Sequence, residues 1–248
     1  MIIFSPLEQF EVYCIVPIKF GAIDFSFTIG SLYLCFIMFF VVLVCILNCN
    51  LLLIPVSGQV LFEFFYKFLF GILSQQASMQ GIFLFPLLVT TFLFIFLSNY
   101  IGLIGFSFTP TSHILITFIL AFSFNLYFIY IGLEQHKIKF LKLFVPTGIS
   151  VFILPLIVLI EVFSYLIRTV SLSVRLFANM LAGHTLLHIF ATFVYILLHT
   201  TNLKLIAIVP FLFLFFIFIL EIGIAFLQSY VFTLLLCIYL GNSLYPAH

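Results

Sequence analysis

Ionisable and strongly polar side chains gather toward the C-terminal end of this chain, inside stretches that are otherwise apolar. They are Glu161, Arg168, Arg175, Asn179, His184, His188, Glu221 and Gln228. A charged side chain at the centre of a bilayer costs at least about 2.5–3.5 kcal/mol on insertion scales. Ionisable residues at that depth mark ion and proton pathways, so proton movement is the chemistry that they suggest.

The charges of residues 161–179 lie on one face of a helix. Glu161, Arg168 and Arg175 are seven positions apart, and seven positions drift only about 20° around an α-helix. Asn179 follows Arg175 by four positions and shares that face. The sequence leaves two interpretations of Glu161 and Arg168 open, a structural ion pair or a part in proton movement.

Arg175 is the charge that its neighbours in sequence do not balance. No acidic residue lies within four positions of it, and a guanidinium keeps its charge at physiological pH. Beyond Glu161, the apolar stretches contain one more acid, Glu221, which forms a second stripe with Gln228 seven positions on. This imbalance predicts that a partner subunit supplies a carboxylate to Arg175.

The two histidines permit more than one interpretation. His184 and His188 are four positions apart and could hold a metal ion, but no third ligand lies close in sequence, so we expect no metal and no cofactor. His184 is nine positions from Arg175 and points to nearly the opposite side of the helix. Because the pKa of histidine lies near physiological pH, a titratable imidazole beside a water pathway is favoured over a packing role.

The composition places these residues in a membrane. Of 248 residues, 66% are hydrophobic and 6% are charged, whereas soluble domains average about 25% charged residues. A soluble domain this apolar could not cover its own surface, so lipid or partner subunits must surround the chain. The net charge of +1 offers no basic face for nucleic acid. We expect one membrane domain over residues 1–248.

Apolar runs that can span the hydrocarbon core, which takes about 20 residues, occur five times. The expected spans cover residues 27–47, 82–101, 113–132, 148–198 and 204–240. The sequence therefore predicts an all-α polytopic membrane protein. Residues 1–26 are expected to form an N-terminal tail, 27–132 peripheral helices, and 148–241 a hairpin of helices that carries the polar residues.

The last two runs are longer than one perpendicular span. At 1.5 Å per residue, residues 204–240 would reach about 55 Å and residues 148–198 more, against a hydrocarbon core of about 30 Å. Each run is therefore either two spans with a hidden turn or one strongly tilted helix. No proline interrupts residues 211–245, which favours continuous tilted helices.

Residues 55–80 have a different pattern. Glu63 and Lys67 lie four positions apart on one helical face, whereas Leu61 and Phe64 fall mainly on another. This pattern predicts an amphipathic helix that lies at the membrane interface and does not span it.

Two segments resemble a known family. Residues 173–184, SVRLFANMLAGH, are similar to the signature of subunit a of the F-type ATP synthases, and residues 221–232, EIGIAFLQSYVF, resemble its last helix. Residues 5–10 and 106–113 fit the mitochondrial members of that family. The resemblance covers essentially the whole chain.

The resemblance implies a mechanism in which this chain is a stator beside a rotating ring of c subunits. Arg175 would attract an ionised ring carboxylate and block a direct proton leak. Two aqueous half-channels would reach this point from opposite sides, lined by Glu221, His184, Gln228, Asn179, Glu161 and Arg168. Protons would pass Glu221 and His184 on the way in and leave near Glu161. The role of Arg168 stays open: it either lines the second half-channel or is a structural partner of Glu161.

The resemblance also implies partners and a location. The expected partners are the c-ring, the peripheral stalk, other membrane subunits, lipid and protons, and no bond chemistry is expected of the chain. The expected location is the mitochondrial inner membrane. Separately, the abundance of Phe, at 38 residues, suggests an AT-rich organellar genome, because Phe, Ile and Leu codons can be AT-rich. Lys67, Lys137, Lys139 and Lys142 fall on one side of the topology, so the positive-inside rule predicts a C-terminus in the matrix and an N-terminus in the intermembrane space.

Three other classes of function are less well supported. A stand-alone channel or secondary transporter tends to show internal repeats, and here the membrane charges sit in one half of the sequence. A purely structural subunit has no need of an unbalanced Arg175 in the membrane. No nucleophile–base set or metal motif supports an intramembrane enzyme.

Overall fold

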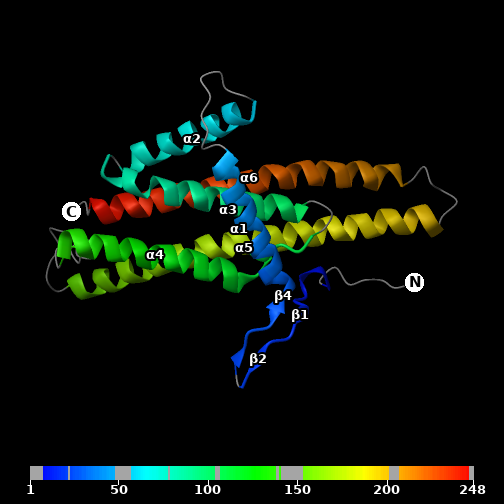
Figure 1. Ribbon diagram of the computed structural model, residues 1–248, viewed down its shortest axis with the longest axis horizontal. Helices are drawn as coiled ribbons and strands as arrows, with labels where there is room; N and C mark the ends of the chain where they lie inside the picture. The colour runs from blue at the N-terminus through cyan, green and yellow to red at the C-terminus, as the bar shows by residue number, and fades with distance from the viewer. Residues whose placement is uncertain are drawn as a thin grey trace. The chain divides into compact units, whose positions relative to one another are not determined.

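The computed structural model describes residues 8–21, 23–47, 57–77, 79–103, 107–137, 140, 153–200 and 207–245. Its α-helices are α1 (Ile29–Leu47), α2 (Ser57–Gln76), α3 (Phe85–Leu103), α4 (Ile114–His136), α5 (Leu154–Thr200) and α6 (Ile208–Leu244) (Figure 1). Short 3-10 turns are η1 (Glu8–Phe10), η2 (Met79–Leu84) and η4 (Pro110–Ser112). The prediction of an all-α polytopic membrane protein is confirmed.

Five helices are long and apolar enough to cross a membrane. They are α1, α3 with the turn before it, α4, α5 and α6. The number of predicted spans is therefore confirmed, with helix ends displaced by a few residues. α2 is not one of the five, and its place at the membrane interface stays a prediction. Within α2, Glu63 accepts a hydrogen bond from Gln59 Nε2 at 2.9 Å.

The start of α1 is fixed by side chains that satisfy free backbone N–H groups. Ser31 N donates to Thr28 Oγ1 at 3.4 Å, and Thr28 N donates to Ser31 Oγ at 3.0 Å. Reciprocal bonds of this kind cap the first turn of a helix. They explain why the helix begins at Ile29 and not at residue 27.

The expected N-terminal tail contains a small β-structure that the sequence analysis did not anticipate. β1 (Cys14–Val16) pairs antiparallel with β4 (Phe27–Thr28), and β2 (Lys19–Phe20) pairs antiparallel with β3 (Ile23–Asp24). Gly21 lies at the turn with φ of 62°, a left-handed conformation that favours glycine.

The chain divides into two compact units. The first consists of Met1–Leu43, Phe94–His113 and Leu176–Ser229. The second consists of Val44–Leu93, Ile114–Arg175 and Tyr230–His248.

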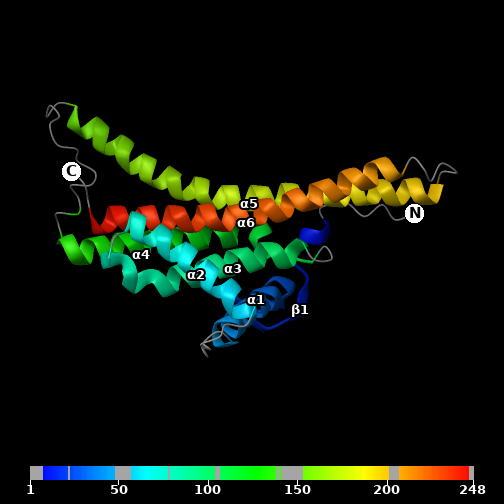
Figure 2. The ribbon, with the colours of Figure 1, turned by 90° about the horizontal axis from the view of Figure 1, so that it is seen from above.

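In the first unit, the C-terminal part of α5 runs beside the N-terminal part of α6, yellow beside orange in Figures 1 and 2. Their shared core includes Met180 and Leu187 of α5 and Ile217 and Ala225 of α6, together with Leu103 at the end of α3. These contacts are apolar, so polar side chains that lie among them need a specific explanation.

In the second unit, hydrogen bonds join α4 to two other helices. Asn125 Nδ2 of α4 donates to Thr169 Oγ1 of α5. His136 Nε2, at the end of α4, is 2.8 Å from the carbonyl oxygen of Leu244 at the end of α6. These bonds link segments that are far apart in sequence.

α5 and α6 are continuous helices of 47 and 37 residues. The hidden-turn alternative is therefore wrong for the described parts of both runs. A helix of 47 residues is about 70 Å long, more than twice the hydrocarbon core of about 30 Å. Strong tilt would accommodate that length and stays a prediction.

Some sequence predictions fall outside the described residues. These concern residues 5–7 and 106 of the two shorter family-like segments, Lys139 and Lys142 of the basic loop, and residues 148–152 and 204–206 of the last two predicted spans.

Candidate functional site

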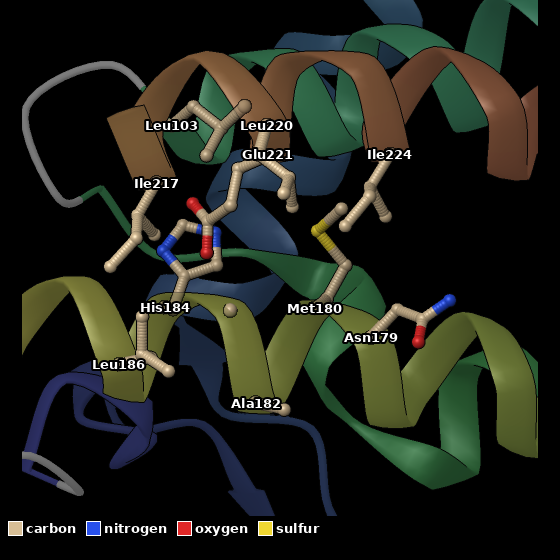
Figure 3. A pocket seen from close by; sticks show the side chains of 11 residues that line it. Leu103, Asn179, Met180, Ala182, His184, Leu186, Ile217, Leu220, Glu221 and Ile224 are labelled. Atoms are coloured by element: carbon tan, nitrogen blue, oxygen red, sulfur yellow. The ribbon is translucent and has the colours of Figure 1, made fainter. Parts of the chain in front are cut away.

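His184 of α5 and Glu221 of α6 point toward one another in the first unit (Figure 3). Their exposed fractions are 2% and 5%. Neither carboxylate oxygen of Glu221, nor Nε2 of His184, has a hydrogen-bond partner among the described residues. Buried polar atoms are nearly always paired, so an acid and an imidazole left this way suggest a site that exchanges protons with water.

The pair borders a cavity of about 210 Å³. Its wall combines Asn179, His184 and Glu221 with apolar side chains, among them Leu103 and Met180. A volume of this size holds several water molecules, each of which needs polar partners that the three polar residues provide. No group of three or more His, Cys, Asp or Glu side chains in the described parts of the chain is arranged to hold a metal ion.

Gly183 allows the carboxylate of α6 to approach α5. A Cβ atom at this position would overlap Glu221 Oε1 and lie 3.0 Å from Glu221 Cδ. Only glycine leaves that space free. The glycine therefore positions Glu221 beside His184.

Segments from elsewhere in the sequence complete the walls around His184. The Phe10 ring of η1 meets the imidazole edge-on, with ring centroids 6.5 Å apart. On α3, a Cβ atom at Gly102 would overlap the Thr109 side chain and lie 3.3 Å from His184 Nε2. Directly after η4, His113 stacks on Phe108 with ring centroids 5.1 Å apart, and burial lowers the pKa of His113, which favours its neutral form.

Gln228 does not share the cavity with Glu221, the other predicted residue of α6. It is buried seven positions after Glu221, but it is not one of the residues that line the space. Asn179, one of the predicted residues of α5, does line it. The stripe that the sequence predicted on α6 therefore places one residue at the cavity and one farther along the helix.

The charged residues of α5 lie in the second unit and have a different environment. Arg175 is exposed, and Arg168 and Glu161 are half-buried. Among the described residues, the one ion pair within 4.0 Å joins Lys19 to Asp24 at 3.8 Å, so no ion pair holds Glu161 to Arg168. Arg168 lies instead over the Tyr239 ring, with its guanidinium carbon 5.8 Å from the centroid.

Comparison with known proteins supplies the family. Residues 28–241 match the family model described as ATP synthase A chain. The chain belongs to the ATP synthase subunit a family. It is 43% identical to ATP synthase subunit a of Pelagibacter ubique over 247 residues, which cover 98% of this chain and 99% of that protein. It is 41% identical to the protein of the same name from Chondrus crispus over 245 residues, which cover 98% of this chain and 97% of that protein.

Membership in the subunit a family makes the chain a membrane-embedded component of ATP synthase, in the F0 sector, with proton transport as its activity. The family resemblance drawn from residues 173–184 and 221–232 is therefore confirmed. A further relative, ATP synthase subunit a of Bartonella bacilliformis, is 41% identical over 256 residues, which cover 98% of both chains.

Four residues that contact the polar side chains of this subunit a were not predicted from its sequence. They are Phe10, Gly102 and Gly183 around His184 and Glu221, and Tyr239 beside Arg168. Gly183 and Phe10 had a signal, since they stand inside the family-like segments 173–184 and 5–10. Gly102 and Tyr239 lie far along the chain from the groups that they touch, so periodicity within one helix could not find them.

Proposed function

We propose that this subunit a conducts protons through two offset aqueous half-channels, to and from the carboxylates of a rotating c-ring. The observation that carries the proposal is the buried Glu221–His184 pair beside a cavity of about 210 Å³. One proton moved across a potential of 100 mV releases about 2.3 kcal/mol. That energy, delivered by successive protons, drives rotation.

The proton-uptake half-channel runs past the cavity. Water brings a proton to Glu221 or His184, since a carboxylate and an imidazole can each accept a proton and pass it on. Asn179 lines the same cavity and orients water between them. The proton then neutralises a carboxylate of the ring, and the neutral site rotates into lipid at lower cost than a charged one.

Arg175 acts as the barrier between the half-channels. Its exposed side chain has no carboxylate within 4.0 Å among the described residues. A guanidinium cannot release its proton, so it attracts an ionised ring carboxylate and repels a proton that would cross directly. The missing anion therefore comes from the c-ring.

The release half-channel passes Glu161. This half-buried carboxylate has no ion pair to Arg168 among the described residues, which leaves it able to accept a proton. Arg168, over the Tyr239 ring, maintains a positive charge along the stripe that leads to Arg175. A positive charge favours the ionised form of a ring carboxylate that comes close to it, and so favours release of the proton from the ring.

We further infer that the subunit works in the mitochondrial inner membrane, with its C-terminus in the matrix. The family-like segments 5–10 and 106–113 and the lysines of the loop after α4 support this location. Its partners are the c-ring, the peripheral stalk and other membrane subunits. The chain performs no bond chemistry of its own and needs no cofactor.

The proposal is tested by proton flux and ATP synthesis in vesicles that contain the assembled complex with Arg175→Ala. We expect coupled synthesis to be abolished, and Arg175→Lys not to restore it fully, because an ammonium lacks the planar, forked donors of a guanidinium. Val174→Ala, a change at the neighbouring exposed position, is the matched control and keeps synthesis.

A reagent that modifies ring carboxylates separates coupled flux from leak. Any flux that remains in Arg175→Ala should be passive and insensitive to the reagent. Normal, reagent-sensitive synthesis in that variant would show that the Arg175 stripe is structural, and would overturn the proposal.

A further inference from the structure

A group of buried polar side chains on α3 and just before η4 has no role in the site described so far. Ser98 and Asn99 have exposed fractions of 0%, and Thr109 has 1%. Ser98 Oγ, Asn99 Nδ2 and Thr109 Oγ1 have no hydrogen-bond partner among the described residues. Three such atoms in one region of an apolar unit require a common explanation.

These side chains adjoin the imidazole of His184. Ser98 and Asn99 precede Gly102 by four and three positions, so all three share one face of α3. At Gly102 that face meets both the Thr109 side chain and His184 Nε2, the latter 3.3 Å from where a Cβ atom would stand. The unpaired nitrogen of His184 therefore faces the same region as the unpaired atoms of α3 and Thr109.

The chemistry of these atoms restricts what can bind them. Asn99 Oδ1 already accepts a hydrogen bond from Thr111 Oγ1 at 2.9 Å, so the free part of this amide is a donor. A metal cation cannot bind a donor, and a side chain of another subunit cannot reach atoms that are almost fully covered by this chain. Water both donates and accepts, so it can satisfy both a hydroxyl and an amide donor.

We propose that Ser98, Asn99 and Thr109 hold a short chain of buried water molecules that leads to His184. Together with the cavity that His184 and Glu221 border, this chain forms a hydrated limb of the uptake half-channel, on the side of η4. The limb rests on the proposed function, because its purpose is to bring protons to His184. Thr111 acts as a positioning residue, since it fixes the orientation of the Asn99 amide.

The test measures proton flux in vesicles that contain the assembled complex with Thr109→Val. Valine keeps the shape and removes the hydroxyl, so we expect flux to fall by about fivefold, as for the loss of one hydrogen bond. Thr109→Ser restores the hydroxyl and should restore flux. The matched control is Thr91→Val, because Thr91 is a buried hydroxyl of α3 that already donates to the Leu88 carbonyl at 2.9 Å.

Glu221→Gln in the same assay separates failure of the limb from failure of the proposed function. Full flux in Thr109→Val together with slow flux in Glu221→Gln would overturn the limb and leave the proposed function intact. Full flux in both variants would overturn both. Asn99→Leu provides a second variant if Thr109→Val does not assemble, and it too should conduct slowly.

A density map of the complex that resolves ordered water provides an independent measurement. Water within hydrogen-bond distance of Thr109 Oγ1 and Asn99 Nδ2 is the expected result. A region filled by apolar side chains, with no water beside these atoms, would overturn the proposal.

Discussion

The carboxylate of Glu221 stands against a position that has no side chain. Its Oε1 atom occupies space that the Cβ of any other residue at Gly183 would fill. The position of the acid relative to His184 thus depends on one missing methyl group on the neighbouring helix. Because the end of the Glu221 side chain is flexible, a larger residue at position 183 would displace the carboxylate without separating α5 from α6.

Gly183→Ala is therefore predicted to impair proton transport and leave assembly intact. Alanine favours a helix by up to about 1 kcal/mol over glycine, so the variant should not unfold. Proton flux in vesicles should fall severalfold, because Glu221 moves away from His184. Gly71→Ala, at a position with nothing within 4 Å of the added atom, is the control. Equal flux in the two variants would contradict this role of Gly183.

Arg168 has an aromatic ring for a neighbour where the sequence suggested a carboxylate. A cation over the face of a ring gains about 0.5–2 kcal/mol, depending on how far it is desolvated. Tyr239→Leu removes the ring and should lower the thermal midpoint of the complex, whereas Tyr239→Phe keeps the ring and should leave the midpoint close to that of the wild type. A loss of the same size in both variants would assign the effect to the hydroxyl.

At the scale of elements, the ends of helices in the second unit pack with very little space between them. A Cβ atom at Gly241 of α6 would overlap the carbonyl oxygen of Gln76 at the end of α2. The obstacle is backbone, which cannot rotate away as a side chain can. The closest approach of these two helices consequently requires glycine.

Gly241→Ala should destabilise the packing of α2 on α6 by about 1–3 kcal/mol, the usual cost of overpacking. Differential scanning calorimetry of the purified complex should show a lower thermal midpoint for this variant. Gly223→Ala, on the same helix but with nothing within 4 Å, controls for the change in helix propensity. A midpoint for Gly241→Ala equal to that of the control would mean that α2 moves freely.

At the scale of the whole molecule, the long helices expose apolar side chains that need covering. α5 exposes Ile160, Phe163 and Ile167, and α6 exposes Phe215 and Phe216, each by more than half of its surface. Exposed apolar surface of this extent is stable only against lipid or partner subunits. Arg175 is also exposed on α5, so the partner subunit must supply an anion to it.

A tag on this chain should therefore capture a ring of small two-helix subunits from membranes solubilised in mild detergent. Native gels and mass spectrometry of the captured material provide the measurement. Recovery of the chain alone, as a monodisperse species that conducts protons by itself, would favour a stand-alone channel over a stator subunit.

Much of this protein follows from local patterns in its sequence. Apolar runs of sufficient length determined five spans, since a helix satisfies its own backbone hydrogen bonds in lipid. The seven-residue spacing of Glu161, Arg168 and Arg175 placed them on one face, and the segment around Arg175 indicated the family. These inferences succeed because each depends on residues within one helix or on composition.

Only the tertiary structure decided which residues meet across different helices. Periodicity gives the face of a helix but not the helix that packs against it. The contact between Glu221 and Gly183 and the ring of Tyr239 beside Arg168 each join distant parts of the chain. Such contacts are fixed by packing of complementary surfaces, a property of the folded chain as a whole that no single segment contains.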